Sequence, residues 1–450
     1  MALTPIASLR DRFLQGQTTP SAALDEAFAH SNANASENTY LSQNKFWSLN
    51  QASRLKSADA ETQLLFGIPV SLKDCFDLAG SRTSSGSRFY QSQPAPKEDS
   101  TVAARLRQAG AIITGKTHMH QLAYGITGEN PDFGDCLQPS NADLLTGGSS
   151  SGAAASVQEG SALAAIGTDT GGSIRIPAAL SGLAGYRSSI TLNTPQIWRG
   201  GHHLAPSMDT VGWIYRDLRD GPLLAQALFN LDPIDKPPSL TGLRIGTPND
   251  AFLGTPEPAV TKALTTMLAQ LTKASATCST FDATMWNNAL DIYSPIVALQ
   301  AAKIHRGNFH HFDPVITARL EAGAATDPQQ ASDLFANMET FRARTSALFN
   351  RFDYLLYPCA PITALPAQLD ASIGSAQSGT PTLERGVART AILRYTTPIS
   401  LAGLPAVTLP FAGGVGLQLI GPMNSDAKLL ALSTTLAEEL SSLPTPSSRP

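Results

Sequence analysis

Two glycine- and serine-rich runs, separated by one short helix and one short strand, constrain the fold of this chain more than any other feature. The first run is GGSSSG at Gly147–Gly152, and the second is GTDTGGSIRIP at Gly167–Pro177. The residues between them predict a helix over Ala153–Glu159 and a buried strand over Ala162–Ile166. A compact unit of this kind carries a serine-bearing loop at each end, with Ser149 in the first loop.

The second loop places Ser173 directly after Gly171 and Gly172. Glycine lets the backbone approach a ligand closely and turn several N–H groups toward one point, which predicts an oxyanion hole or an anion site. A Gly/Ser run taken alone is typical of a turn or a linker. This one is different, because it carries Asp169 and Arg175, leaves through Ile-Arg-Ile-Pro and follows a buried strand.

A third segment, GIPVSLKD at Gly67–Asp74, lies upstream. Its alternation of apolar and polar residues predicts a half-buried strand with Ser71 and Lys73 on one face, and with Lys73 near its C-terminal end. Judged by position alone, a lysine at such a place is usually a surface charge.

These three segments match, in order and spacing, the three signatures of the amidase signature family of serine hydrolases. The chain resembles that family over most of its length and is closest in appearance to the bacterial carboxybiuret/allophanate hydrolase-type amidases. The resemblance implies an α/β fold in which one large domain, residues 1–440 with a core signature at about 67–190, has a mixed central β-sheet covered by helices. We expect residues 441–450 to be a frayed tail.

The family also implies a Ser, cis-Ser, Lys triad. It carries over onto Ser173 as the nucleophile, Ser149 as the bridging serine after a cis peptide bond from Gly148, and Lys73 as the base. Four backbone N–H groups of the second loop would form the oxyanion hole, those of Thr170, Gly171, Gly172 and Ser173. The implied activity is hydrolysis of a linear C–N amide bond through an acyl-enzyme, with no metal and no cofactor.

The residue types suit that chemistry. A serine hydroxyl is a poor nucleophile at neutral pH and needs a base within hydrogen-bond reach. A lysine can serve when burial lowers its pKa, because desolvation disfavours the charged form. We therefore expect Lys73 to be buried, with Ser149 passing protons between it and Ser173.

Asp169 and Arg175 flank the loop, and we expect an ion pair between them that holds its shape. The catalytic alternative is a Ser-His-Asp triad that uses Asp169. None of the eight histidines lies in a comparable motif, and Asp169 is only four residues before Ser173. The ion pair is therefore the favoured interpretation.

Candidate substrate contacts come from three further segments. QLAYGITGEN resembles a family stretch that lines the pocket. YLLYPCAP predicts a buried strand leading into a proline-rich loop, which the family resemblance implies faces the active site. A His-Arg pair follows an apolar run and could reach a substrate carboxylate. The candidates are Tyr124, Thr127, Cys359, His305 and Arg306.

A different class of function is suggested by Gly110–Thr117, which formally matches the P-loop pattern GxxxxGK[ST]. A true P-loop follows a strand and forms a loop around phosphate. Here a predicted helix over Ser100–Ala109 precedes the glycine, and Ala-Ile-Ile inside the pattern favours a strand. A nucleotide-binding protein remains a remote alternative, which would require ATP binding that Lys116→Ala abolishes.

Charge and composition bound the partners. With a net charge of −4 and no long basic run, nucleic acid is not expected as a partner, because phosphate binding depends on clustered Lys and Arg. No apolar run reaches the ~20 residues of a membrane span, and no signal-peptide core is recognisable. We expect a cytoplasmic enzyme for a small-molecule amide, with reduced cysteines and either a homodimer or a small accessory subunit. The main alternative is an amidotransferase A-type subunit that supplies ammonia to a partner.

The sequence departs from the usual family pattern after the second loop. Many relatives have Gly-Leu-Lys-Pro where this chain has Gly-Tyr-Arg-Ser at Gly185–Ser188. The departure leaves the expected catalytic residues in place but weakens any transfer of substrate specificity. The length and the C-terminal half look most like the carboxybiuret/allophanate-type branch, and this resemblance implies a small urea-derived or carboxylated amide as the substrate.

Overall fold

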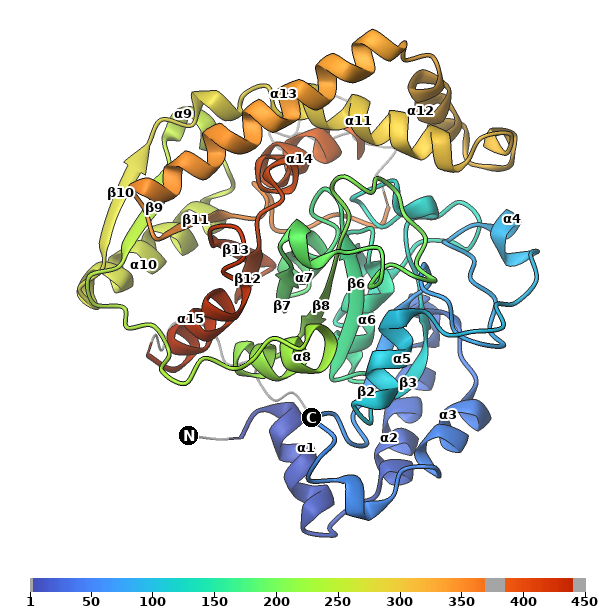
Figure 1. Cartoon of the computed structure of the whole chain (residues 1–450). Coiled ribbons are helices and arrows are strands. Elements are labelled where there is room, and N and C mark those ends of the chain that lie inside the picture. The colour runs from blue at the N-terminus through green and yellow to red at the C-terminus, as the bar shows by residue number, and fades with distance from the viewer. Residues whose placement is uncertain (1–2, 369–384, 440–450) are drawn as a thin grey trace.

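The computed structural model describes residues 3–368 and 385–439, and the tail expected at 441–450 lies outside these residues. An eleven-stranded sheet runs through the described part of the chain, between helices (Figure 1). In sheet order the strands are β1 (Tyr40–Ser42), β3 (Ile112–Thr117), β2 (Pro69–Lys73), β6 (Ala164–Asp169), β8 (Thr210–Tyr215), β7 (Ala184–Arg187), β12 (Ala406–Phe411), β13 (Val415–Ile420), β11 (Tyr354–Pro358), β9 (Arg244–Pro248) and β10 (Thr277–Phe281). A separate hairpin consists of β4 (Leu137–Gln138) and β5 (Asn141–Leu145).

The sheet is mixed, as expected. β2 is parallel to both β3 and β6, with Val70 opposite Ile113 on one side and Ala164 on the other. β6 then pairs antiparallel with β8. Because the carboxyl ends of neighbouring parallel strands meet at the same edge of a sheet, Lys73 at the end of β2 lies beside the segment that follows β6.

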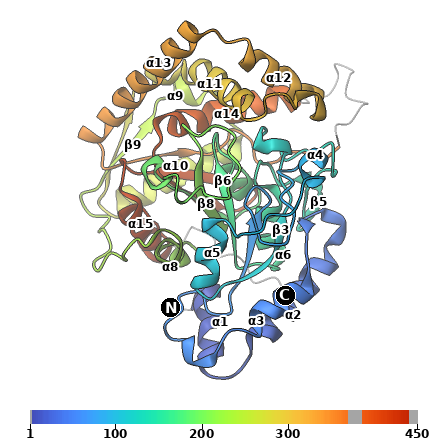
Figure 2. The ribbon, with the colours of Figure 1, turned by 45° about the vertical axis from the view of Figure 1, so that its right-hand side comes forward.

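Helices cover both faces of the sheet. Figures 1 and 2 show α11–α13 at one end of the molecule and α1–α3 at the opposite end. Along the chain the helices are α1 (Pro5–Leu14), α2 (Pro20–Ala33), α3 (Lys45–Ala52), α4 (Arg88–Gln91), α5 (Thr101–Gln108), α6 (Ser151–Glu159), α7 (Arg175–Leu180), α8 (Gly221–Phe229), α9 (Asp250–Leu253), α10 (Pro258–Lys273), α11 (Ala289–Ile304), α12 (Pro314–Ala324), α13 (Pro328–Ser346), α14 (Arg385–Ala402) and α15 (Asp426–Glu439). Among the residues described, no helix is both long enough and apolar enough to cross a membrane.

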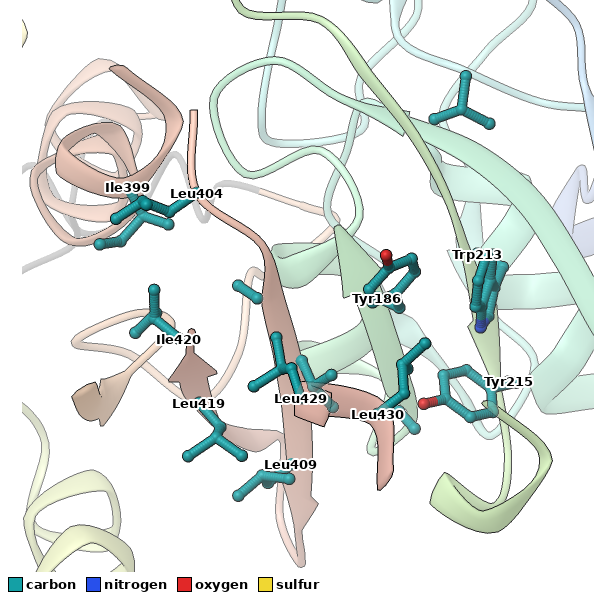
Figure 3. Packing of buried hydrophobic residues seen from close by; sticks show 14 of the residues in the cluster. Tyr186, Trp213, Tyr215, Ile399, Leu404, Leu409, Leu419, Ile420, Leu429 and Leu430 are labelled. Atoms are coloured by element: carbon teal, nitrogen blue, oxygen red, sulfur yellow. The ribbon is translucent and has the colours of Figure 1, made fainter. Parts of the chain in front are cut away.

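The main hydrophobic core lies between the strands and these helices. Figure 3 shows part of it, where Leu430 of α15 lies beside Tyr186 of β7 and Tyr215 of β8. The rings of Tyr186 and Trp213 have centroids 4.3 Å apart. The burial of such large apolar side chains contributes most of the favourable free energy that holds helices against a sheet.

Local sequence signals explain where several elements begin and end. The side chain of Thr19 accepts a hydrogen bond from Ala22 N–H at the start of α2, and Asp327 forms a capping box with Gln330 at the start of α13. Gly160, with a φ of 90°, ends α6 in the left-handed conformation that glycine adopts readily. The positions of α6 and β6 confirm that a helix and a strand lie between the two serine loops.

Two predictions about strands are corrected or settled here. β2 was expected to be half-buried, but all five of its residues are buried, because it has parallel neighbours on both sides and helices over both faces. The P-loop interpretation is wrong, since Gly115, Lys116 and Thr117 belong to β3 and form no loop. The buried Lys116 ammonium instead pairs with Asp74 at 2.7 Å.

Candidate active site

The sheet places a buried lysine where a base was expected. Lys73 Nζ donates to Ser149 Oγ at 2.8 Å and to Thr168 Oγ1 at 2.7 Å, and its side chain is fully buried. Within the described residues, no carboxylate lies within 4.0 Å of this nitrogen. Burial lowers the pKa of Lys73 from 10.5 to about 8, so on the order of a tenth of the molecules hold it neutral at pH 7.

Ser149 lies in the turn between β5 and α6. The peptide bond from Gly148 to Ser149 is cis, and Ser149 is fully buried. The backbone of Gly128 packs directly on Gly148, where an added Cβ would lie 2.8 Å from the Gly128 nitrogen. The Ser149 carbonyl accepts a hydrogen bond from His120 N–H at 3.2 Å. These contacts fix the turn that presents the Ser149 hydroxyl to Lys73.

The loop that carries Ser173 is organised by the carboxylate of Asp169, the last residue of β6. This carboxylate accepts hydrogen bonds from the backbone N–H groups of Gly172 at 2.9 Å and Ile174 at 3.2 Å. It therefore sets the path of the chain on both sides of Ser173 and the start of α7.

Two buried arginines hold that carboxylate. Arg175 donates to Asp169 through Nε and Nη2, which confirms the ion pair expected from the sequence, and Arg187 donates to it through Nη1 at 3.0 Å. Burial alone would raise the pKa of Asp169, but the charges of both arginines outweigh that effect and lower it. Asp169 is therefore a carboxylate at any physiological pH.

The geometry changes the expected set of oxyanion donors. Gly172 N–H is directed at Asp169 and is not free to bind a substrate oxygen. In the described part of the chain, no acceptor faces the N–H groups of Thr170, Gly171 and Ser173. The loop thus has three available donors instead of four.

Ser173 lines a cavity of about 20 Å³, which has room for about one water molecule. Tyr124, Tyr293 and Arg389 line the same cavity. A larger hollow of about 450 Å³ adjoins it, since Gly125 and Arg389 line both spaces.

The residues proposed as substrate contacts separate into two groups. Tyr124 lines the Ser173 cavity, and Thr127 lines the larger hollow, where its hydroxyl donates to Glu129 at 2.7 Å. Both come from the QLAYGITGEN segment.

The other three candidates line neither of these two spaces. His305 is buried and shares a 2.8 Å hydrogen bond with Tyr90 Oη, whereas Arg306 is exposed. Cys359 is fully buried, with its sulfur 3.7 Å from Thr408 Oγ1. Their surroundings favour structural roles, because they are packed against protein or lie at the surface.

Three residues of the site were missed by sequence reasoning. Arg187 was noted only as a departure from the family pattern, yet it is the second arginine on Asp169. Tyr293 of α11 and Arg389 of α14 lie more than 100 residues after Ser173 and in no recognisable motif. The one available signal was the Tyr-Arg pair at 186–187, since a charged residue inside an apolar strand needs a buried partner.

Comparisons with known proteins show which family this chain belongs to. The family model described as Amidase matches residues 24–430. The chain is 31% identical over 417 residues to an indoleacetamide hydrolase of Allorhizobium ampelinum, which covers 86% of this chain and 87% of that protein. It is 30% identical over 426 residues to the A subunit of a glutamyl-tRNA(Gln) amidotransferase from Symbiobacterium thermophilum, with 84% of each chain covered. A solved amidase structure superimposes with a TM-score of 0.84 at 31% identity, over 96% of this chain and 99% of that one.

Proposed function

Since this chain belongs to the amidase family and is a hydrolase of C–N bonds, we propose that it cleaves linear amides of small molecules through an acyl-enzyme on Ser173. The observation that carries the proposal is the 2.8 Å hydrogen bond from the buried Lys73 ammonium to Ser149 Oγ, away from any carboxylate of the described residues. A lysine in this setting is a base with a pKa near the working pH, as general-base catalysis requires.

The first half of the reaction forms the acyl-enzyme. Neutral Lys73 takes the proton of Ser149, which takes that of Ser173 as its oxygen attacks the amide carbonyl carbon. The charge that develops on the carbonyl oxygen is stabilised by loop N–H groups, and one such donor typically contributes roughly 3 kcal/mol. The proton then returns through Ser149 to the departing nitrogen, the C–N bond breaks, and the acyl group remains on Ser173.

The second half releases the acid. A water molecule enters where the amine has left and gives its proton to the same serine–lysine relay as it attacks the ester carbonyl. Collapse of this intermediate breaks the bond to Ser173 and returns the proton to the serine oxygen. No other residue has to titrate, so Lys73 is protonated and deprotonated once in each half.

Covalent labelling tests the assignment. A serine-directed fluorophosphonate should label the wild-type protein at Ser173, and Ser173→Ala should abolish both labelling and amide turnover while leaving the fold intact. Ser181→Ala is the matched control, because Ser181 follows α7 and its hydroxyl has no partner among the described residues. Labelling at another serine, or full turnover by Ser173→Ala, would contradict the mechanism.

The similarity to the A subunit of an amidotransferase supports a second candidate function, release of ammonia from glutamine for a partner. A free-standing amidase should hydrolyse small amides without any added protein, as a monomer or a homodimer. Size-exclusion chromatography combined with a glutaminase assay separates the two. Turnover of small amides by the isolated protein favours the amidase, whereas glutamine hydrolysis that depends on an added partner favours the amidotransferase.

A further inference from the structure

A guanidinium group with an unsatisfied donor lies where the Ser173 cavity meets the larger hollow. It belongs to Arg389 of α14, which lines both spaces. Its Nε is buried and has no hydrogen-bond partner, and within the described residues no carboxylate lies within 4.0 Å of the side chain. A cation in this position favours the binding of an anion.

Arg175 and Arg187, two fully buried arginines beside the nucleophile loop, have their guanidinium groups satisfied by several partners. Arg175 binds Asp169, Gln418 Oε1 and Ser400 Oγ. Arg187 binds Asp169 and several backbone carbonyls. Burying a charge without such partners is costly, so a site that keeps Arg389 apart from the carboxylates described is suited to a ligand that supplies the missing negative charge.

A second arginine increases the positive potential at this place. Arg319 of α12 lines the larger hollow, where Nη1 donates to the Tyr124 carbonyl at 2.8 Å and the guanidinium lies 5.3 Å from the centre of the Tyr124 ring. Burial lowers the pKa of Arg319, and the nearby charge of Arg389 adds to this effect.

Of the two spaces, only the larger hollow is lined by acidic side chains. Glu129, Asp135 and Asp313 line the larger hollow but not the Ser173 cavity, where Arg389 is the charged residue. Tyr124 and Tyr293, whose side chains each carry a hydroxyl, also line the Ser173 cavity. Together they offer hydrogen-bond donors beside a fixed positive charge, a set that matches the two oxygens of a carboxylate.

We propose that the substrate is an amide that also carries a carboxylate, and that Arg389 holds this carboxylate while Ser173 attacks the amide carbonyl. The inference deepens the proposed function and rests on it. Because Arg389 and Ser173 line the same small cavity, the two groups of the substrate are separated by a short carbon chain. For a primary amide with the carboxylate on its acyl part, water supplies the oxygen of the new carboxyl group, the C–N bond breaks, and the products are a dicarboxylate and ammonia.

Protection from the fluorophosphonate probe measures carboxylate binding without turnover. Malonate, succinate and glutarate should be compared with their neutral diamides as protectants of Ser173. At least one dicarboxylate should protect at a concentration on the order of 100-fold below that of its diamide. In Arg389→Gln this difference should shrink to within a few fold, when the protected labelling rate of each variant is divided by its own unprotected rate.

Arg394→Gln is the matched control, because Arg394 lies on the same helix but donates to the Ala251 carbonyl and lines a different hollow. In this variant the dicarboxylates should protect Ser173 from the probe as well as they do in the wild type. Arg389→Lys keeps the positive charge but lacks the planar guanidinium group. It should therefore retain part of the difference in protection between a dicarboxylate and its diamide. Turnover should follow the same order, with succinamate preferred to butyramide by the wild type and by Arg394→Gln but not by Arg389→Gln.

The labelling experiment distinguishes failure of the carboxylate inference from failure of the proposed function. If Ser173 is labelled but no dicarboxylate protects better than its diamide, or if Arg389→Gln keeps the difference, the carboxylate inference is wrong and the amidase mechanism stands. If Ser173 is not labelled in the wild type, the proposed function itself is wrong.

Discussion

Lys73 shows how strongly surroundings decide what a side chain does. Its position at the end of a strand is typical of a surface charge, yet it is fully buried and contacts two hydroxyls. Desolvation without a nearby carboxylate favours the neutral amine. Only the family signatures, not the local pattern, pointed to this state from the sequence.

The lowered pKa of Lys73 predicts the pH dependence of the enzyme. In the proposed mechanism the neutral amine is the base, so kcat/KM for an amide should rise about tenfold per pH unit below pH 8 and level off above it. Acidification removes activity because it protonates Lys73. The measurement is a pH series with a neutral amide, and Lys73→Ala should lack the rise. A profile that is flat from pH 6 to pH 9 would mean that another group is the base.

Asp169 is the residue whose loss should damage the fold most directly. Asp169→Asn leaves Arg175 and Arg187 buried with less negative charge, and breaking a buried pair typically costs ~3–5 kcal/mol. Urea unfolding should therefore show a large fall in midpoint, together with loss of turnover. Asp353→Asn, at the half-exposed pair with Arg244, is the control and should cost much less.

The same carboxylate gives a pH dependence of stability with a definite sign. Because the folded state lowers the pKa of Asp169, its contribution is fully present above the ordinary aspartate value of ~3.9 and is lost as the pH falls below it. The acid-induced loss should be smaller in Asp169→Asn than in the wild type. Equal losses would show that Asp169 does not contribute.

At the scale of elements, the loop between β6 and α7 depends on two glycines for space. A Cβ on Gly171 would lie 2.2 Å from Tyr293 Oη, and one on Gly172, whose φ is 122°, would lie 2.8 Å from Thr396 Oγ1. Gly171→Ala and Gly172→Ala should each lower kcat by at least about tenfold, because the loop must shift its N–H groups to make room.

Gly182→Ala is the control for these variants. Its φ is also positive, at 67°, but no atom lies within 4 Å of an added Cβ, so we expect a stability cost of about 1 kcal/mol and wild-type kcat. Wild-type rates in both loop variants would show that the loop does not position the reacting oxygen.

Elements with strong local signals could be predicted from the sequence. The capped starts of α2 and α13 and the glycine that ends α6 are examples, since a cap is set by residues a few positions apart. The burial of both faces of β2 could not be predicted in this way, because it depends on β3 and β6 as neighbours. The P-loop pattern shows the reverse case, in which a local motif is overruled by the strand that contains it.

At the scale of the whole molecule, the site combines distant parts of the chain. The two serines and Lys73 could be predicted because they lie in contiguous motifs, whereas Arg389 could not, since only the folded chain brings α14 to the Ser173 cavity. The order of the strands in the sheet also depends on contacts between distant parts of the chain. β12 and β13 lie between β7 and β11, so the C-terminal strands complete the sheet that carries the catalytic loop.

Dividing the chain should therefore destroy the fold of the N-terminal part. A fragment of residues 1–236 leaves β7 as an open edge and leaves Arg175 without Gln418 and Ser400. We expect it to show no protected amides in hydrogen exchange around Asp169. Co-expression with residues 237–450 should restore protection and probe labelling if the two parts associate. A fragment 1–236 that folds and is labelled alone would contradict this dependence.

The anchoring of Arg175 to residues of α14 and β13 also bears on when the enzyme gains its activity during synthesis. A ribosome adds Ser400 and Gln418, which bind Arg175, more than 200 residues after it has completed the nucleophile loop. While those residues are being made, a growing polypeptide carries the loop without these two contacts. We therefore expect Ser173 to become reactive only after Ser400 and Gln418 have been added.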